Sequence, residues 1–458
     1  MLILSRQNGT YTINYNEYYN TLLKKSSNNQ VQVRRTNTSP PSKDISPIPE
    51  MNMEPHIGPI SPKITQTLPQ NTSVTQLRTP PQKKILIIAE YRGGSTFTSE
   101  LFNKNPYATF LFEPFLLAAG RNDENRQLSI LNEIYNECSL PNVGKYLTYE
   151  YRMKHQNVKA VLRGCEVSNV CFRSSSVSLN REPFCEKKSK WTQSALSQTS
   201  QTRVKRTRYM NTKCPKINYN TFQSFCQSKD FITSKVIRAN SLEMLENDFL
   251  NKDENFYVLY VIRDPRGVYS SRNSIHKFSK SGKENYVGSL DRALKLSCEF
   301  YKKNVEYLKR ILQSSGDSRE SSRPEWLTKN RIIPVRYEDL ALNPEYYTDK
   351  IYDLIGNDKG KNIVKQILLK ETHQAKSNLK NTYGTKRDAK YTISAWTRKL
   401  NFESETKKIQ EYCGEELMRD LGYRSFGSDK EQVESIYKDG ILFENWFYDI
   451  SSNEYNFV

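Results

Sequence analysis

The sequence predicts an α/β fold in which helices flank a parallel β-sheet. The first unit of this fold is a strand–turn–helix. A short β-branched run at 84–89 has the pattern of a strand buried on both faces. A tight turn at 91–96 with two adjacent glycines follows it directly, and a helical pattern comes next. Later strand-like runs also alternate with helical ones. That alternation is typical of a parallel sheet, whose ligands bind at the carboxyl ends of the strands.

The individual elements follow from apolar periodicity and its interruptions. After the turn, Phe97, Leu101 and Phe102 recur at helical spacing, and Pro106 ends that helix. We expect strands at 84–89, 231–237, 256–262 and 331–336. We expect helices at 242–250, 286–313, 345–355, 361–374 and 403–421. We expect polar surface loops at 186–213 and 314–330.

Length and composition set the division into domains. The chain has 458 residues, and ten of its 19 prolines lie between Pro40 and Pro81 in a polar stretch. Such a composition buries too little apolar surface to offset its ordering entropy. We therefore expect a disordered stem at 1–82, one α/β domain at 83–427 and a C-terminal tail at 428–458. No run approaches the roughly 18 to 20 apolar residues that cross a bilayer.

The chain is strongly basic. Its 69 Lys and Arg exceed its 50 Asp and Glu by 19. This excess suits a polyanionic or phosphorylated partner, although coding bias toward Lys, Asn and Tyr is an alternative explanation. The insertion at 186–213 carries eight basic residues against one acid. It could contact an anionic polymer, but a solvated loop is the preferred interpretation.

The cysteines favour an oxidising compartment. There are eight, none forms a C-x-x-C pair, and only 4 histidines accompany them, so no metal site is expected. Five of the eight lie between Cys165 and Cys226, which suits an insertion held by disulfides. The pairing cannot be read from the sequence. The set is Cys138, Cys165, Cys171, Cys185, Cys214, Cys226, Cys298 and Cys413.

The turn after the first strand predicts an anion site of the P-loop-like kind. Gly93 and Gly94 permit a sharp turn, and the following helix directs its free N–H groups and positive dipole end at the same point. Ser95 and Thr96 add hydroxyl donors. The nucleoside-triphosphate signature G-x-x-x-x-G-K-[ST] is absent, because Arg92 precedes the glycines and no Lys follows them.

A second candidate site follows the strand at 256–262. Arg263 stands at its end, and Ser271 lies about two turns along the next helix. Both could reach one phosphate, the arginine as a bidentate clamp and the serine as a hydrogen-bond donor. The alternative is an ordinary ion pair between Arg263 and Asp264 within the loop.

Several further motifs stand in order along the chain. They are Phe112-Glu113-Pro114, Ser234-Lys235-Val236-Ile237-Arg238, the segment from Arg263 to Arg272, Val335 to Pro344, Tyr383 to Arg387, Ala395 to Arg398, and Leu421-Gly422-Tyr423. Together with Arg92 to Phe97, this series resembles the Golgi carbohydrate sulfotransferases that modify O6 of Gal, GalNAc or GlcNAc, such as the chondroitin and keratan sulfate enzymes. The resemblance runs from about 84 to 425. Gly93 in place of Ser or Thr, Thr397 between Trp396 and Arg398, the large basic insertion and the lack of a visible membrane anchor depart from it.

The resemblance implies a sulfotransferase fold and a sulfotransferase catalytic domain at 83–427. It also implies 3′-phosphoadenosine 5′-phosphosulfate as donor, a glycan or glycosaminoglycan as acceptor, and a Golgi location. Nucleic acid is not an expected partner, and membrane association would need an anchor not visible in this chain. By family position, Arg92, Gly93, Gly94, Ser95, Thr96 and Phe97 bind the 5′-phosphosulfate. Arg263 and Ser271 bind the 3′-phosphate, with help from the loop of Gly384, Thr385, Lys386 and Arg387.

Two further residues have roles with open alternatives. Glu113 is the expected general base, because no histidine lies in a comparable motif; a turn-capping role is the alternative. Lys235 is expected to touch the sulfonate or to be structural. No metal is expected, because cationic side chains and the helix end supply the charge. The rival functions are a non-catalytic heparin-type binding protein and a nucleotide kinase, which would require Mg²⁺.

Overall fold

A computed structural model describes the greater part of the chain. The described residues are 4–7, 10–13, 81–118, 121, 123–146, 165, 169–173, 175–189, 210–278, 290–313, 324–372, 388–434 and 446–455. Within the predicted stem, β1 (Leu4–Gln7) and β2 (Thr10–Ile13) pair as an antiparallel hairpin. No helix among these residues is both long and apolar enough to cross a membrane.

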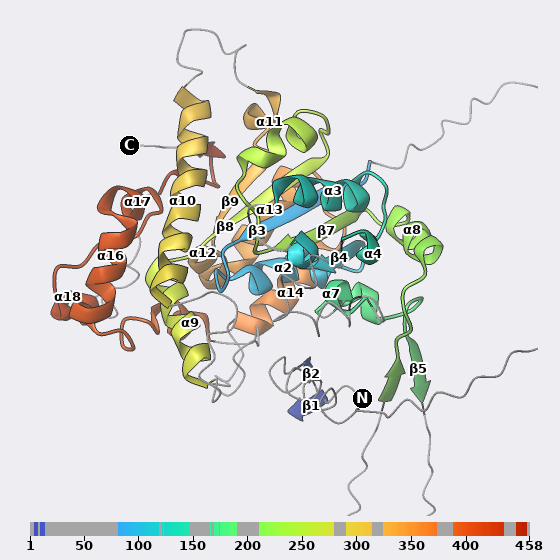
Figure 1. The fold of residues 1–458 in the computed structure, drawn as a ribbon, viewed down its shortest axis with the longest axis horizontal. Coiled ribbons are helices and arrows are strands. Elements are labelled where there is room, and N and C mark those ends of the chain that lie inside the picture. The colour runs from blue at the N-terminus through green and yellow to red at the C-terminus, as the bar shows by residue number, and fades with distance from the viewer. Residues whose placement is uncertain are drawn as a thin grey trace, which may run out of the picture.

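A five-stranded sheet with strand order β4-β7-β3-β8-β9 forms the centre of the molecule, and all its pairings are parallel (Figure 1). Its members are β3 (Lys83–Ala89), β4 (Ala108–Phe112), β7 (Phe231–Val236), β8 (Phe256–Ile262) and β9 (Ile332–Arg336). Four of these strands were expected from their apolar runs, and the parallel α/β fold is confirmed. The fifth, β4, was not expected.

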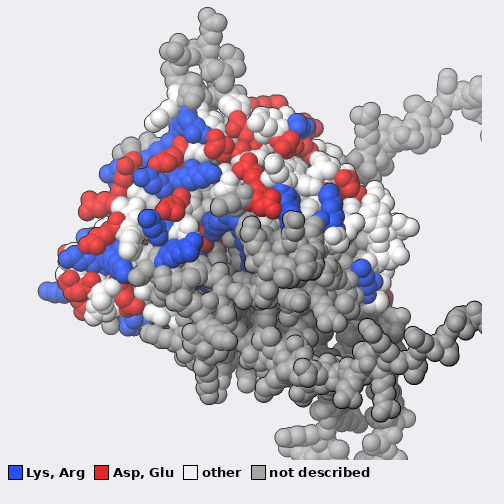
Figure 2. All heavy atoms as spheres, viewed as in Figure 1, with Lys and Arg blue, Asp and Glu red and all other residues white. Residues whose placement is uncertain are grey.

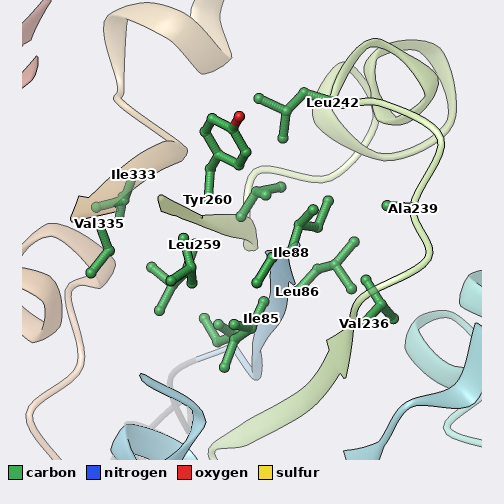
Figure 3. Close-up of a cluster of buried hydrophobic side chains, with 14 of the residues drawn as sticks. Ile85, Leu86, Ile88, Val236, Ala239, Leu242, Leu259, Tyr260, Ile333 and Val335 are labelled. Carbon is green, nitrogen blue, oxygen red and sulfur yellow. The ribbon is translucent and has the colours of Figure 1, made fainter. Parts of the chain in front are cut away.

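The sheet is buried on both faces, which explains its continuous apolar strands. Figure 3 shows Tyr260 on one side of the sheet and Leu259 on the other. The Tyr260 face packs on α10 through Phe300, whereas the opposite face packs on α2, where Phe102 lies 5.5 Å from the ring of Phe231. Ligands are thus excluded from the faces and confined to the edge where the strands end.

The helices follow the predicted alternation. Those around the sheet are α2 (Ser95–Asn103), η1 (Pro114–Ala118), α3 (Glu124–Tyr135), α4 (Val143–Tyr146), α7 (Val170–Arg173), η3 (Ser178–Asn180), α8 (Tyr219–Gln227), α9 (Pro265–Phe278) and α10 (Leu290–Gln313). Later ones are α11 (Glu325–Thr328), α12 (Tyr337–Leu342), α13 (Pro344–Ile355), α14 (Lys361–Thr372), α15 (Ala389–Ser394) and α18 (Asp429–Glu434). In Figure 1, α10 lies along one flank with the C-terminal helices outside it.

Three predicted segments differ from the structure. The helix expected at 403–421 is divided into η7 (Phe402–Thr406), α16 (Lys407–Cys413) and α17 (Glu415–Asp420), because Gly414 takes φ 81° between the last two. The segment 242–250 forms a 3₁₀ turn, η4 (Glu243–Leu245), and a π turn, η5 (Glu246–Leu250), instead of an α-helix. The loop expected at 314–330 contains α11, whose Trp326 is buried.

The basic insertion is anchored at its base. Its two ends pair as antiparallel strands β5 (Glu186–Ser189) and β6 (Met210–Lys213), and a disulfide joins the flanking Cys185 and Cys214. The prediction of a plain surface loop is therefore wrong for these two segments, and 190–209 lie outside the described residues. Further disulfides join Cys138 to Cys226 and Cys298 to Cys413, and Cys165 is also disulfide-bonded, as the cysteine content led us to expect.

Part of the predicted C-terminal tail is folded onto the domain. A short hairpin of β10 (Tyr448–Asp449) and β11 (Glu454–Tyr455) approaches β9, where the Tyr455 hydroxyl donates to the Ile332 carbonyl at 2.7 Å. Trp446 lies under the guanidinium of Arg336, 5.1 Å from it. The tail thus covers the β9 edge of the sheet, where an uncovered strand would be open to pairing.

Candidate active site

The residues singled out from the sequence gather at one edge of the sheet. Arg92 follows β3, Glu113 follows β4, Lys235 lies near the end of β7 and Arg263 follows β8. These strands are all parallel, so their carboxyl ends meet at the same edge. Glu113 and Lys235 belong to the β4–β7 half of that edge, and Arg92 and Arg263 to the β3–β8 half.

The turn after β3 is too tight for side chains at its two glycines. The Gly93 N–H donates to the Glu90 carbonyl at 2.8 Å, and a Cβ on Gly93 would lie 2.8 Å from that same oxygen. Gly94 has φ 89°, and a Cβ there would lie 2.3 Å from the ring of Tyr337. The departure at Gly93 from the expected family pattern therefore suits this turn, which accepts only glycine at both positions.

The turn leads directly into the positive end of α2. The backbone N–H groups of Gly94, Ser95 and Thr96 find no acceptor among the described residues, and no acidic residue occupies the first turn. Such groups, at the positive end of the helix dipole, favour an anion. Phe97 does not face that point, because its buried ring packs edge-on against Tyr337 at 5.9 Å.

A buried ion-pair network, which no sequence pattern predicted, supports the turn on the side away from the site. Arg272 donates to the Glu90 carboxylate at 2.6 Å and to the Tyr91 carbonyl at 2.7 Å, and its Nη1 contacts Ser297 Oγ at 2.7 Å. Arg121 pairs with the second oxygen of Glu90. The adjacent residues Ser271 and Arg272 thus have different contacts: Arg272 holds the backbone of the turn, and Ser271 contacts Arg92.

The structure brings Arg92, Ser271 and Arg263 together. Arg92 Nε donates to Ser271 Oγ at 3.0 Å, and Arg263 Nη1 donates to the Arg92 carbonyl at 3.0 Å. The alternative ion pair between Arg263 and Asp264 does not form, since the Asp264 carboxylate is taken by Arg266 at 2.9 Å. Arg263 Nε is buried and has no hydrogen-bond partner among the described residues, so this guanidinium has a donor left for an anion.

The guanidinium of Arg263 is positioned by α12. It lies 4.6 Å from the ring centre of Tyr337, the ring that also covers Gly94. Next to it, the buried Glu338 carboxylate accepts from the Asp264 N–H at 3.2 Å and from the Tyr423 hydroxyl at 2.8 Å. Burial raises the pKa of Glu338 to about 7, although the charge of Arg263 opposes that shift.

A second cluster lies in the β4–β7 half. Glu113 Oε1 pairs with Lys235 Nζ at 2.6 Å, and Oε2 pairs with Arg238 Nη1 at 2.9 Å. Burial alone would raise the pKa of Glu113, but the two cations outweigh it and lower that pKa, so the group is a carboxylate at neutral pH. Burial lowers the pKa of Lys235, and the charges of Arg238 and Arg92 act in the same direction. The Lys235 ammonium also lies 4.0 Å from the Phe112 ring centre.

Other predicted residues are not placed here. Gly384, Thr385, Lys386 and Arg387 lie outside the described residues. Within the parts of the chain that the structure describes, no three or more His, Cys, Asp and Glu side chains gather in a way that could hold a metal ion.

Comparison with known proteins agrees with this geometry. Residues 82–422 match the sulfotransferase domain family. The chain belongs to the sulfotransferase family. Carbohydrate sulfotransferase 1 of Danio rerio is 26% identical over 370 residues, which are 76% of this chain and 79% of the relative. Carbohydrate sulfotransferase 1 of Homo sapiens and carbohydrate sulfotransferase 3 of Tetronarce californica are each 24% identical, over 76% and 75% of this chain and 80% and 73% of their own.

The matches confirm the resemblance to carbohydrate sulfotransferases that the motifs indicated. They also confirm that the chain is an enzyme with a sulfotransferase fold. The matched span begins one residue before β3 and ends at Gly422, so it contains the turn after β3, Arg92, Arg263 and the Glu113 cluster.

Proposed function

We propose that the enzyme transfers the sulfuryl group of 3′-phosphoadenosine 5′-phosphosulfate to a sugar hydroxyl, O6 of GalNAc, Gal or GlcNAc, in a glycan or glycosaminoglycan. The observation that carries this proposal is the meeting of Arg92, Ser271 and Arg263 at the free N-terminus of α2. Two adjacent cationic groups suit a donor that carries a phosphosulfate at one end of its ribose and a phosphate at the other.

The residues divide between the two ends of the donor. The 5′-phosphosulfate accepts from the N–H groups of Gly94, Ser95 and Thr96, and Arg92 neutralises its phosphate. The 3′-phosphate takes the free donors of Arg263 and the hydroxyl of Ser271. Residues 384–387 complete that subsite by family position. The buried Nε of Arg263 supports this assignment, because a buried donor without an acceptor is costly.

The reaction needs an in-line displacement at sulfur. The bond between sulfur and the bridging oxygen of the phosphosulfate breaks, and its electron pair leaves with the 5′-phosphate, where Arg92 and the α2 N–H groups stabilise the charge. The bond between the sugar oxygen and sulfur forms as the hydroxyl proton passes to Glu113. The lowered pKa makes Glu113 a weak base, so it accepts the proton only as the S–O bond develops and the hydroxyl becomes acidic.

Lys235 has a supporting role in this scheme. Its side chain is 1% exposed and bound to Glu113, so it reaches the sulfonate only when the acceptor draws Glu113 away. The acceptor class and the Golgi location are proposed from the carbohydrate sulfotransferases that the chain resembles, and the disulfides are those of an oxidising compartment.

The direct test is incubation with labelled donor and a panel of desulfated glycosaminoglycans, with and without EDTA, followed by disaccharide analysis. Metal-independent transfer to a sugar hydroxyl is the expected result. Dependence on Mg²⁺ with transfer from ATP would favour a nucleotide kinase, and polyanion binding without turnover would favour a binding protein. Either outcome would overturn the proposal.

The assignment of Arg263 has its own test. Arg263→Ala should weaken binding of 3′-phosphoadenosine 5′-phosphate by about 10- to 100-fold, since hydrogen bonds to charged groups contribute about 1.5–3 kcal/mol. It should hardly change binding of the analogue that lacks the 3′-phosphate. Arg310→Ala, which removes an exposed arginine paired with Glu243 on the flank of the molecule, is the matched control. Equal loss for both ligands in Arg263→Ala would exclude the 3′-phosphate assignment.

A further inference from the structure

We propose that Arg238 binds a carboxylate of the acceptor, that of a uronic acid next to the sugar that receives the sulfuryl group. The inference rests on the proposed function and deepens it, because it selects uronate-containing chains over neutral galactose- and N-acetylglucosamine-based chains. Arg238 would then be a specificity-determining residue of the same site.

Arg238 is the accessible cation of the Glu113 cluster. Its side chain is 26% exposed, whereas that of Lys235 is 1% exposed, so Arg238 is the more accessible of the two to a group that arrives from solvent. Its backbone carbonyl accepts from Gln127 Nε2 at 2.8 Å, which fixes the residue on the sheet edge. The Arg238 backbone is thus held in place, and the guanidinium extends from a fixed point.

Most hydrogen-bonding capacity of this guanidinium is unused. An arginine carries five N–H donors in a rigid fork, and here Nη1 alone has a partner among the described residues, Oε2 of Glu113. A planar carboxylate can bind two of the remaining donors at once. The charge balance agrees, because one carboxylate, Glu113, faces two cations and the cluster keeps one positive charge.

The position of Arg238 assigns that charge to the acceptor rather than the donor. Arg92 and Arg263, which bind the donor in the proposed function, follow β3 and β8. Arg238 follows β7, on the β4 side of them, and contacts the proposed base. In-line transfer places the attacking oxygen opposite the leaving phosphate, so a side chain bound to the base lies beside the acceptor sugar.

The test compares desulfated chondroitin with its carboxyl-reduced form as acceptors, in the wild type, Arg238→Gln and Arg238→Lys. The wild type should prefer the uronate form in kcat/KM by about tenfold or more, the usual effect of a charged hydrogen bond. Arg238→Gln should bring the two acceptors to within about twofold of each other, and Arg238→Lys should keep part of the preference. The ratio cancels any effect of the substitution on Glu113, because both acceptors use the same base.

Controls separate this inference from the proposed function. Affinity for 3′-phosphoadenosine 5′-phosphate should be unchanged in Arg238→Gln, and Arg310→Gln should keep the wild-type preference, since it removes the same charge from an exposed pair elsewhere. An unchanged acceptor ratio in Arg238→Gln, a wild type without preference, or a loss of nucleotide affinity would each overturn the inference while transfer itself persists. Absence of transfer to every glycan would overturn the proposed function as well.

Discussion

Arg92 and Glu113 share a backbone conformation that residues other than glycine rarely adopt. Their φ angles are 67° and 45°, in the left-handed region that favours glycine. Each is fixed by its neighbours: the Gly93 N–H closes the turn after Arg92, and the Glu113 N–H donates to the Lys235 carbonyl at 2.8 Å. Unfavourable backbone of this kind is often found at functional sites, where the surrounding structure holds a side chain in a required direction.

Glu113→Gln should separate catalysis from donor binding. The substitution removes the proton acceptor, so turnover should fall by about 10²- to 10⁴-fold, the usual range for lost general-base catalysis. Affinity for 3′-phosphoadenosine 5′-phosphate, measured by calorimetry, should stay within about twofold. Glu133→Gln is the control, because Glu133 is also a largely buried carboxylate paired with a lysine, Lys145, at 2.8 Å. Normal turnover in Glu113→Gln would remove Glu113 from the mechanism.

Gly94→Ala should damage both stability and donor binding. The left-handed conformation alone costs a residue with a Cβ about 1–2 kcal/mol, and forced contact with the Tyr337 ring adds about 1–3 kcal/mol. Gly356→Ala is matched, since Gly356 has φ 70° but nothing within 4 Å of its added Cβ. Urea unfolding should show the larger loss for Gly94→Ala, and only that variant should lose nucleotide affinity. Equal losses would mean that Tyr337 does not confine the turn.

For single residues, the sequence indicated which side chains gather at the site. It did not indicate which contacts hold them there. Arg92, Arg263 and Ser271 were singled out from the sequence, and the structure brings them together: Arg92 and Arg263 follow the neighbouring strands β3 and β8, and Ser271 lies on α9. The support given by Arg272 to Glu90 was not predicted, because two side chains 182 positions apart meet only through the packing of α9 on the turn. No local sequence pattern indicates such a contact.

Among the elements, α12 connects the two parts of the proposed donor site, the turn after β3 and Arg263. It begins at Tyr337, whose ring lies next to both Gly94 and Arg263. The next residue, Glu338, contacts the loop after β8. A displacement of this short helix would therefore move the turn after β3 and Arg263 together.

The buried Glu338 should make stability depend on pH. Burial raises its pKa from the ordinary value of 4.5 to about 7. The folded protein then keeps a proton that the unfolded chain has lost, so the free energy of unfolding falls as pH rises from about 4.5 to about 7, by up to about 3 kcal/mol. Glu338→Gln is uncharged throughout and should remove this dependence. Urea unfolding of both proteins from pH 4.5 to 8 measures it, and parallel profiles would exclude it.

The element boundaries that were missed have local physical reasons. The run 108–112 is apolar and aromatic, and it reads as a strand once the following Glu113 is placed at the sheet edge. It escaped prediction because, unlike the four predicted strands, it contains no Ile or Val. The division of 403–421 depends on the left-handed Gly414, a residue that a helix also tolerates at some cost, so composition alone did not reveal the break.

For the whole molecule, the sequence carries a net charge of +19. On the face shown in Figure 2, Lys and Arg side chains are mixed with Asp and Glu over the described part. The insertion at 186–213 differs, with eight basic residues against one acid. The pairing of β5 with β6 and the Cys185–Cys214 disulfide join its two ends to each other.

Replacing residues 190–209 by Asn-Gly should therefore leave the enzyme folded. Ser189 and Met210 are paired across the hairpin, and a two-residue Asn-Gly turn fits such a pair. The change removes five basic residues and no acid, so the net charge falls to +14 from +19. Nucleotide affinity and turnover on a short oligosaccharide should be unchanged, whereas kcat/KM on a polymeric glycosaminoglycan should become less sensitive to salt, because long-range attraction is screened within about 10 Å at 0.1 M. Lower turnover on the short acceptor would instead make the insertion part of the active site.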